Sequence, residues 1–158
     1  MTPTEELATL LLRRGFTLSV AESCTGGMIG SMMTSIPGSS SFFLGGAITY
    51  SNESKIKLLN VPSATIETHG AVSRETATEM AKGVLSLYNS DLSVAVTGIA
   101  GPGGGTPEKP VGLVFTSVSD KNITDVRRHL FNGDREVVRA SASEAAIIHL
   151  IDLLKNRI

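Results

Sequence analysis

The stretch "GFTLSVAESCTGGMIGSMM", residues 15–33, decides the fold because its hydrophobic period changes halfway along. Residues 16–21 alternate between apolar and polar side chains, which predicts a β-strand. A helix is expected to begin near Thr25, because apolar residues then recur with helical spacing on one buried face. The members of that face are Met28, Ile29, Met32, Met33 and Ile36. The segment "AESCTGG", residues 21–27, therefore lies at a strand-to-helix corner.

The rest of the chain continues the alternation of helices and strands. Thr2 and Pro3 predict the start of a first helix, and Gly15 predicts its end. Strands are expected within 42–50, 91–100, 111–119 and 123–131, and helices within 51–60, from Ser73 to Tyr88, and after Asp134. The short "DKN" turn makes the last two strands a hairpin. This order predicts one α/β domain over residues 1–158, a three-layer α/β/α arrangement with a mixed sheet.

Composition excludes several classes of function. Lys and Arg number 14 against 15 Asp and Glu, and aromatic residues make up 4% of the chain, so nucleic acid is a poor candidate partner. One cysteine and three scattered histidines cannot form an internal disulfide or a Cys-rich zinc site. No apolar run approaches the roughly 18 residues of a membrane span. We expect a cytoplasmic protein without a membrane partner.

The corner "AESCTGG" offers two candidate nucleophiles. Ser23 would lie at the positive end of the following helix, where free N–H groups can bind an oxyanion or a phosphate. Alternatively, Ser23 or Thr25 is only an N-cap and the two glycines only allow close packing. Cys24 is the rival nucleophile, but no histidine lies near it in sequence, and a small buried thiol is the usual outcome.

A second candidate site is "TYSNESK", residues 49–55. Lys55 lies in the first turn of a predicted helix, where the macrodipole disfavours a cation and therefore favours the neutral amine. A lysine general base needs that neutral form near pH 7. The alternative is a solvated surface lysine whose charge is offset by the neighbouring Glu53.

A third candidate site combines "TGIAGPGGGTPEKP", residues 97–110, with "FNGDR", residues 131–135. Glycines allow the backbone to approach a ligand closely, and Arg135 can bind a phosphate or a carboxylate through two parallel hydrogen bonds. The alternative is a flexible loop beside an ordinary arginine at a helix start. The three histidines have no partner at metal-ligand spacing, so structural roles are expected for them.

Five motifs, "AESCTGG", "GSSSFFLGGAITYSNESK", "HGAVS", "TGIAGPGGGTPEKPVG" and "FNGDR", occur here in a characteristic order and spacing. In this the chain resembles the CinA C-terminal family, specifically its stand-alone nicotinamide-nucleotide amidohydrolases of the PncC type, over about residues 5–155. Many relatives carry an additional amino-terminal domain that resembles molybdopterin-binding proteins, and 158 residues leave no room for it. The activity of that domain is therefore expected to be absent.

The resemblance implies hydrolysis of the carboxamide of nicotinamide mononucleotide to nicotinate mononucleotide and ammonia, a step in pyridine-nucleotide recycling. It implies Ser23 as nucleophile together with Tyr50 and Lys55, no metal or other cofactor, and a homodimer. Amides near Thr25 and Gly26 are expected to bind the oxyanion. The phosphate is expected to contact Arg135 and the backbone from Gly101 to Thr106.

Two other interpretations remain open. The domain could be a non-catalytic nucleotide-binding module, or a structural or regulatory partner in competence or damage response. The presence of both Ser23 and Lys55 favours the enzyme, because a protein that only binds needs neither a nucleophile nor a base.

Overall fold

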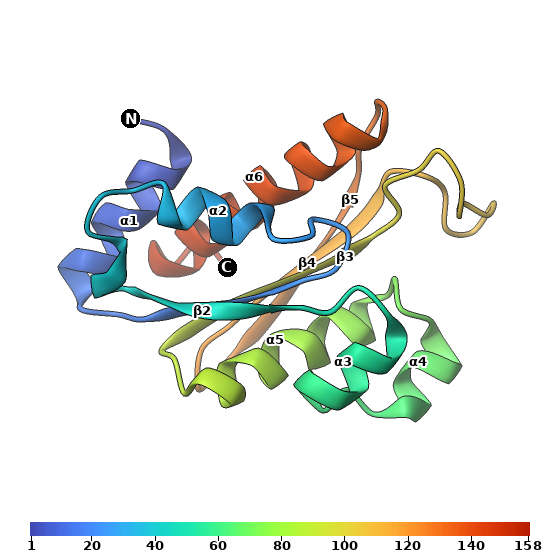
Figure 1. The fold of residues 1–158 in the computed structure, drawn as a ribbon, viewed down its shortest axis with the longest axis horizontal. Coiled ribbons are helices and arrows are strands. Elements are labelled where there is room, and N and C mark those ends of the chain that lie inside the picture. Colours follow the sequence, from blue (N-terminus) through green and yellow to red (C-terminus); the bar gives the residue numbers. More distant parts are fainter.

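Five strands form one mixed sheet in the order β2-β1-β3-β4-β5 (Figure 1). The strands are β1 (Leu18–Glu22), β2 (Phe43–Ile48), β3 (Leu92–Gly98), β4 (Leu113–Ser119) and β5 (Thr124–Leu130). Strand β1 pairs in parallel with β2 and β3, whereas the β3–β4 and β4–β5 pairs are antiparallel. This computed structural model describes residues 1–158. It confirms the predicted mixed sheet and the hairpin near the carboxyl terminus.

Helices cover both faces of the sheet, so the predicted three-layer arrangement is also confirmed. The helices are α1 (Pro3–Arg14), α2 (Met28–Thr34), α3 (Asn52–Leu59), α4 (Ser63–His69), α5 (Arg74–Tyr88) and α6 (Arg135–Leu154). Figure 1 shows α1, α2 and α6 on one face and α3, α4 and α5 on the other. The side chain of Asp134 caps α6, as predicted, by accepting the amide of Val137. No helix is both long and apolar enough to cross a membrane.

The first helix begins and ends where the sequence predicts. Thr2 accepts the Glu5 amide while Glu5 accepts the Thr2 amide, which is a complete capping box. Gly15 ends the helix in the left-handed conformation. Local side-chain chemistry therefore determines both boundaries of α1.

Two other boundaries differ from the prediction. Helix α2 begins at Met28 rather than near Thr25, because Gly26 and Gly27 both adopt positive φ angles, of 61° and 109°, that an α-helix cannot contain. Helix α4 was not predicted; it is a single short segment that begins after Pro62. The longer corner between β1 and α2 therefore leaves residues 23–27 as a turn rather than as helix, with residues 23–25 buried.

The larger apolar core lies between the sheet and the α1, α2 and α6 layer. Ile29 and Met33 of the predicted apolar face are fully buried there, and Met32 and Ile36 pack against the same core. A smaller core around Met80 lies between the sheet and α5. The methionine-rich face of α2 is therefore structural, as predicted.

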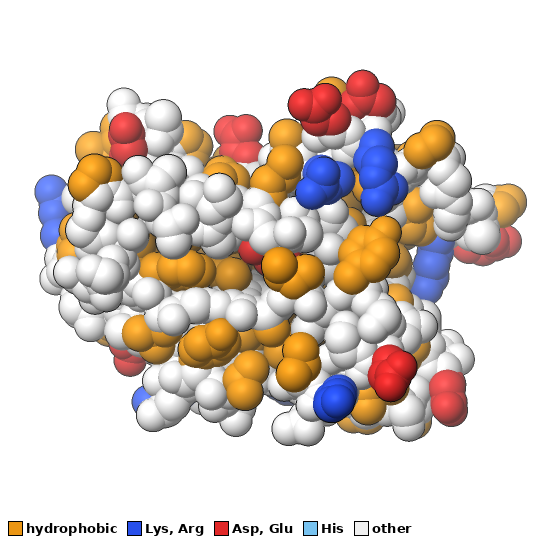
Figure 2. All heavy atoms as spheres, viewed as in Figure 1, with side chains coloured by type: hydrophobic (Ala, Val, Ile, Leu, Met, Phe, Trp, Pro, Cys, Tyr) orange, Lys and Arg blue, Asp and Glu red, His pale blue; other side chains and the backbone are white.

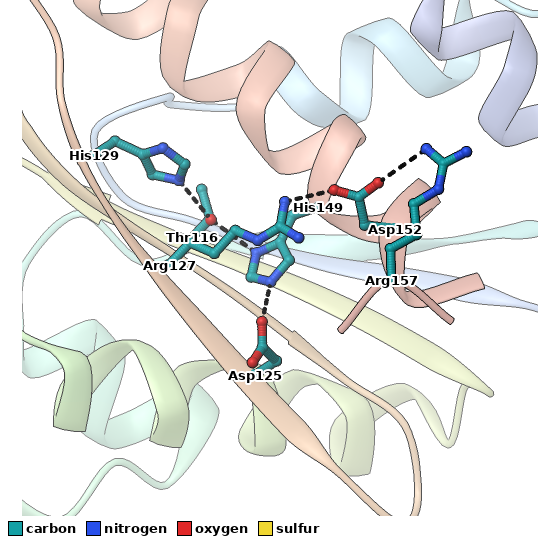
Figure 3. A network of polar contacts seen from close by, with 7 residues as sticks. All are labelled: Thr116, Asp125, Arg127, His129, His149, Asp152 and Arg157. Carbon is teal, nitrogen blue, oxygen red and sulfur yellow. Dashed lines mark hydrogen bonds and ion pairs between the residues drawn. The ribbon is translucent and has the colours of Figure 1, made fainter. Parts of the chain in front are cut away.

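A buried polar network attaches α6 to the sheet edge (Figure 3). His149 on α6 lies with Nε2 2.8 Å from Asp125 Oδ2 and with Nδ1 2.8 Å from the Thr116 hydroxyl. The same hydroxyl is 2.9 Å from Nε2 of His129 on β5. The network thus connects α6 to both β4 and β5.

Candidate active site

The candidate site lies at the carboxyl ends of β1, β2 and β3. The chain leaves β1 toward α2 on one face of the sheet and leaves β2 toward α3 on the other face (Figure 1). Such a divergence between neighbouring parallel strands opens a crevice, and ligands of α/β proteins bind at this point. Residues 23–27 after β1 and residues 49–55 after β2, which are far apart in sequence, meet there.

Ser23 and Lys55 are in direct contact in this crevice. Lys55 Nζ lies 2.9 Å from Ser23 Oγ, and both residues are buried, with 1% of the lysine exposed. Lys55 Nζ also donates to the carbonyl oxygens of Thr49 at 2.7 Å and Tyr50 at 3.2 Å. A neutral amine has two hydrogens for these carbonyls and one lone pair, which then points at the Ser23 hydroxyl. The arrangement suits a lysine that accepts a proton from a serine.

The environment of Lys55 favours this neutral form. Burial lowers the pKa of Lys55 to about 8, because removing the ammonium from water costs free energy. The nearby Cys24 acts weakly in the opposite direction. The direction agrees with the sequence prediction, and burial is its leading cause. The alternative of a solvated surface lysine is wrong.

The main-chain carbonyl and the phenol of Tyr50 lie in different parts of the site. Lys55 contacts the main-chain carbonyl of Tyr50, whereas the phenol is exposed and its hydroxyl lies 3.4 Å from Nη2 of Arg135. The side chain therefore does not steady the lysine amine. It lies at the mouth of the crevice, where a substrate would enter.

Cys24 has the features of a structural thiol. It is buried in the core shared by α1, α2 and α6, and burial raises its pKa to about 11. A cysteine nucleophile needs a lowered pKa, since the thiolate is the reactive form. Between the two candidate nucleophiles of the corner, the geometry therefore favours Ser23.

The amides of Ile29 and Gly30 at the start of α2 are bound within the chain and do not face the site. The buried carboxylate of Glu22 accepts the amides of Ile29 at 2.9 Å and Gly30 at 3.0 Å, so it caps a helix whose own N-cap, Gly27, has no side chain to do so. The amide of Gly26 donates to the carbonyl oxygen of Ser23 at 3.2 Å. Gly26 is therefore a poorer oxyanion donor than expected.

A cleft of about 290 Å³ opens beside the crevice. Its lining comes from Cys24, Tyr50, Arg135 and the backbone of residues 98–104. Arg135 donates to the Gly101 carbonyl at 2.7 Å and forms no ion pair, so a cation remains available at the rim. Gly101 and Arg135 thus lie together, as the sequence suggests.

Thr106 lies outside this cleft. Its amide donates to the carbonyl of Lys109 at 2.8 Å, and its hydroxyl accepts the Lys109 amide at 3.0 Å. Both groups close a local turn in an exposed part of the loop, so the phosphate contact expected from Thr106 has no support from the cleft and stays a prediction. The part of the loop that reaches the cleft ends at Gly104.

Arg139 also contacts the corner, although it was not predicted as a site residue. Its Nε donates to the Cys24 carbonyl at 3.0 Å and its Nη2 to the Thr25 carbonyl at 3.2 Å. Figure 2 shows Lys and Arg side chains gathered over the amino-terminal turns of α6, where Arg135 and Arg139 lie. The spacing of four residues places both on one helix face, which is the signal that could have identified Arg139.

A larger hollow of about 630 Å³ lies elsewhere, between α5 and the β4–β5 turn. Hydroxyl and amide side chains dominate its lining, together with Lys82 and Lys121. It contains no activated nucleophile comparable with Ser23. The crevice at the strand ends is therefore the better candidate for the active site, because it contains an activated nucleophile even though its cleft is smaller.

Comparison with known proteins identifies the family to which the chain is related. A family model described as the CinA C-terminal domain matches residues 2–154. A CinA-like protein of Chlorobaculum tepidum is 51% identical over 156 residues, which are 96% of this chain and 37% of that protein. A CinA-like protein of Geotalea uraniireducens is 49% identical over 152 residues, or 96% of this chain and 35% of the relative. The chain thus spans about a third of the length of these relatives.

Solved structures show the same fold over the whole domain. A CinA superfamily protein of Klebsiella pneumoniae is 34% identical with a TM-score of 0.94, covering 98% of this chain and 96% of its own. The competence/damage inducible protein CihA of Agrobacterium tumefaciens is 41% identical with a TM-score of 0.90, covering 97% and 96%. On sequence and on structure alike, this chain belongs to the CinA family through the C-terminal domain of that family.

Proposed function

We propose that this domain is an amidase that hydrolyses the carboxamide of nicotinamide mononucleotide to nicotinate mononucleotide and ammonia. The observation that carries the proposal is the 2.9 Å contact between Ser23 Oγ and the buried amine of Lys55. A serine and a neutral lysine in hydrogen-bond contact are a nucleophile with its base. The choice of substrate follows from the resemblance of the five motifs to nicotinamide-nucleotide amidohydrolases.

Acylation begins when neutral Lys55 accepts the proton of the Ser23 hydroxyl. The serine oxygen forms a bond to the carboxamide carbon, and the carbonyl electron pair moves to oxygen, which gives a tetrahedral oxyanion. The carbon–nitrogen bond then breaks, and the Lys55 ammonium returns its proton to the departing nitrogen as ammonia. The positive pyridinium ring withdraws electrons from the amide and so promotes the attack.

In deacylation, water is the nucleophile and the Ser23 oxygen is the leaving group. Lys55 accepts a proton from water while the water oxygen attacks the acyl carbon. The bond to Ser23 Oγ breaks, and Lys55 returns the proton to the serine. The carboxylic acid that forms releases its proton to solvent, which leaves the carboxylate product and the free enzyme, and no redox partner is needed.

The cleft supports binding of the nucleotide part of this substrate. Arg135 is a cation at the rim without a carboxylate partner, which suits a phosphate. The phenol of Tyr50 lies beside that guanidinium and within reach of the ribose or the ring. The mouth of the cleft therefore offers one charged and one aromatic contact.

The alternative is a nucleotide-binding or competence/damage-response domain without catalysis. Its support is the printed names of relatives such as the competence/damage inducible protein of Agrobacterium tumefaciens. A binding-only domain has no reason to bury a lysine amine against a serine, since burying it without water costs free energy. The contact therefore favours the enzyme.

The test is to incubate the purified protein with nicotinamide mononucleotide in the presence of a chelator and to measure ammonia and nicotinate mononucleotide. Turnover by the wild type that disappears in a folded Ser23→Ala variant is the expected result. Binding of substrate without ammonia release would identify a binding domain. Full activity in Ser23→Ala would refute the serine mechanism.

A further inference from the structure

Thr25 is fully buried, yet its hydroxyl and its amide N–H have no partner within the chain. Its hydroxyl makes no hydrogen bond, and its amide N–H donates to no protein acceptor. Buried donors are almost always paired, because an unpaired one costs roughly 1–3 kcal/mol. An unpaired amide two residues after the candidate nucleophile therefore suggests a donor whose acceptor arrives with the substrate.

Arg139 fixes the direction in which this amide points. The Cys24 carbonyl accepts Nε of Arg139 at 3.0 Å. Carbonyl and N–H groups of one trans peptide point in opposite directions, so the Thr25 N–H points away from Arg139. The Thr25 carbonyl accepts Nη2 at 3.2 Å, which orients the next peptide plane in the same way. One planar guanidinium thus holds two consecutive peptide planes.

The candidate nucleophile and its base lie on the side of this peptide that is opposite Arg139. Arg139 reaches the corner from α6 on one face of the sheet, whereas Lys55 reaches Ser23 Oγ from α3 on the other face (Figure 1). At the far end of the corner, Glu22 holds the first amides of α2 in bonds of their own. The amides of Cys24 and Gly27 also donate to no protein acceptor, but the Thr25 N–H belongs to the peptide whose carbonyl Arg139 Nε holds, so its direction is fixed.

On this basis we propose that Arg139 is a positioning residue that presents the Thr25 amide to the oxyanion, an inference that rests on the proposed amidase function. Arg139 touches neither the nucleophile nor the base. It acts through the peptide plane between Cys24 and Thr25. Since an oxyanion donor acts in the transition state, loss of Arg139 should lower kcat more than it changes substrate binding.

The experiment measures steady-state kinetics with nicotinamide mononucleotide for Arg139→Ala and Arg139→Lys. Removing one oxyanion donor typically costs about 10²–10³-fold in kcat, and KM should change by less than about threefold. Added guanidinium should restore part of the kcat of Arg139→Ala, whereas Arg139→Lys stays slow because an ammonium cannot hold both planes. Arg128→Ala, an exposed arginine on β5, is the matched control.

A second measurement separates positioning from general damage to the fold. Affinity for a boronic acid analogue of the substrate, which forms a tetrahedral adduct with Ser23, should fall by the same factor as kcat/KM. Affinity for the product nicotinate mononucleotide should stay within about threefold of the wild type. Thermal unfolding of each variant verifies that it is folded.

The outcomes divide cleanly. A raised KM with unchanged kcat would mean that Arg139 binds the ground-state substrate, and wild-type kinetics would mean that it has no role; either result overturns the inference. Both results leave the proposed function intact, because the wild type still turns over. Absence of turnover in the wild type would instead refute the proposed function itself.

Discussion

Two regions of this domain each bury a base beside a hydroxyl. At the strand ends, Lys55 lies against Ser23; at the sheet edge, His149 lies against Thr116 (Figure 3). Burial lowers the pKa of Lys55 to about 8 and that of His149 to about 4. By pKa alone, either region could be taken for a functional site.

The hydrogen-bond partners distinguish the two regions. His149 donates from Nε2 to Asp125, so its Nδ1 accepts the Thr116 hydroxyl, and that hydroxyl in turn accepts Nε2–H of His129. Every donor and acceptor facing inward is thus paired, and no ligand is needed to complete the set. The network therefore has a structural role, because it holds α6 against β4 and β5.

The corner at Ser23 has the opposite character. Thr25 keeps an unpaired amide and hydroxyl, and the cleft beside it holds Arg135, a cation without an ion-pair partner. Groups left without partners beside an activated nucleophile are groups held for a substrate. Buried donors and acceptors without partners, more than a lowered pKa, therefore distinguish the candidate site from the histidine network.

The largest expected effect comes from Lys55→Met, which keeps the length of the side chain and removes the base. We expect kcat for nicotinamide mononucleotide to fall by on the order of 10⁴-fold, nearly as far as in Ser23→Ala, because nucleophile and base act as one unit. The double variant should be no slower than either single one. Additive losses in the double variant would show that the two residues act independently and would weaken the comparison.

The histidine network should respond to acid by losing stability. The unfolded chain binds a proton to His149 near pH 6.5 whereas the folded chain does so near pH 4, so stability falls as pH decreases through that window. Between pH 7 and pH 5 this difference amounts to about 2 kcal/mol, roughly a 30-fold change in the unfolding equilibrium.

Urea unfolding at the two pH values measures this effect. His149→Leu should be less stable at pH 7, because Thr116 and Asp125 lose a partner, but its stability should change less between pH 7 and pH 5. Its kcat at pH 8 should stay within about twofold of the wild type at temperatures where the variant is folded. A selective loss of kcat in the folded variant would show that the histidine network has a catalytic role, and the two regions would then no longer differ in function.

The sequence predicted the layers of the fold because local signals specify them. The capping box of α1, the glycine that ends it and the short turn between β4 and β5 act within a few residues. The corner was predicted less well, because the positive φ angles at Gly26 and Gly27 delay α2. Glycine permits such a conformation without requiring it, so the sequence alone could not place the start of that helix.

The candidate site shows the same limit. Ser23 and Lys55 could be selected from their local positions, but the pairing of the two and the burial of Lys55 depend on how α3 packs. Arg139 is 115 residues from Cys24 in sequence, and its contacts follow only from the packing of α6 over the corner. Glu22 likewise acts across a turn, by occupying amides that the helix start would otherwise present.

The pH dependence of the reaction tests whether Lys55 is the base. Because the base must be unprotonated, kcat/KM should rise from pH 7 to a plateau above about pH 9 with an apparent pKa near 8. The expected gain is about tenfold between pH 7 and pH 9. A rate profile with its midpoint near pH 6.5 would point to a histidine instead of Lys55, and would require a different base.

The smallest effect is expected from Cys24→Ala, which tests the rival nucleophile within the same corner. The thiol is buried and its pKa is raised to about 11, so almost none of it is thiolate at pH 8. We expect kcat to fall by less than about threefold, through the loss of a small buried group beside Ser23. For the same reason iodoacetamide should inactivate the wild type slowly at pH 8. Rapid inactivation that parallels alkylation of Cys24, together with an inactive Cys24→Ala variant, would identify the thiol as the nucleophile. Lys55 would then be the base for Cys24 and not for Ser23, the residue that it contacts.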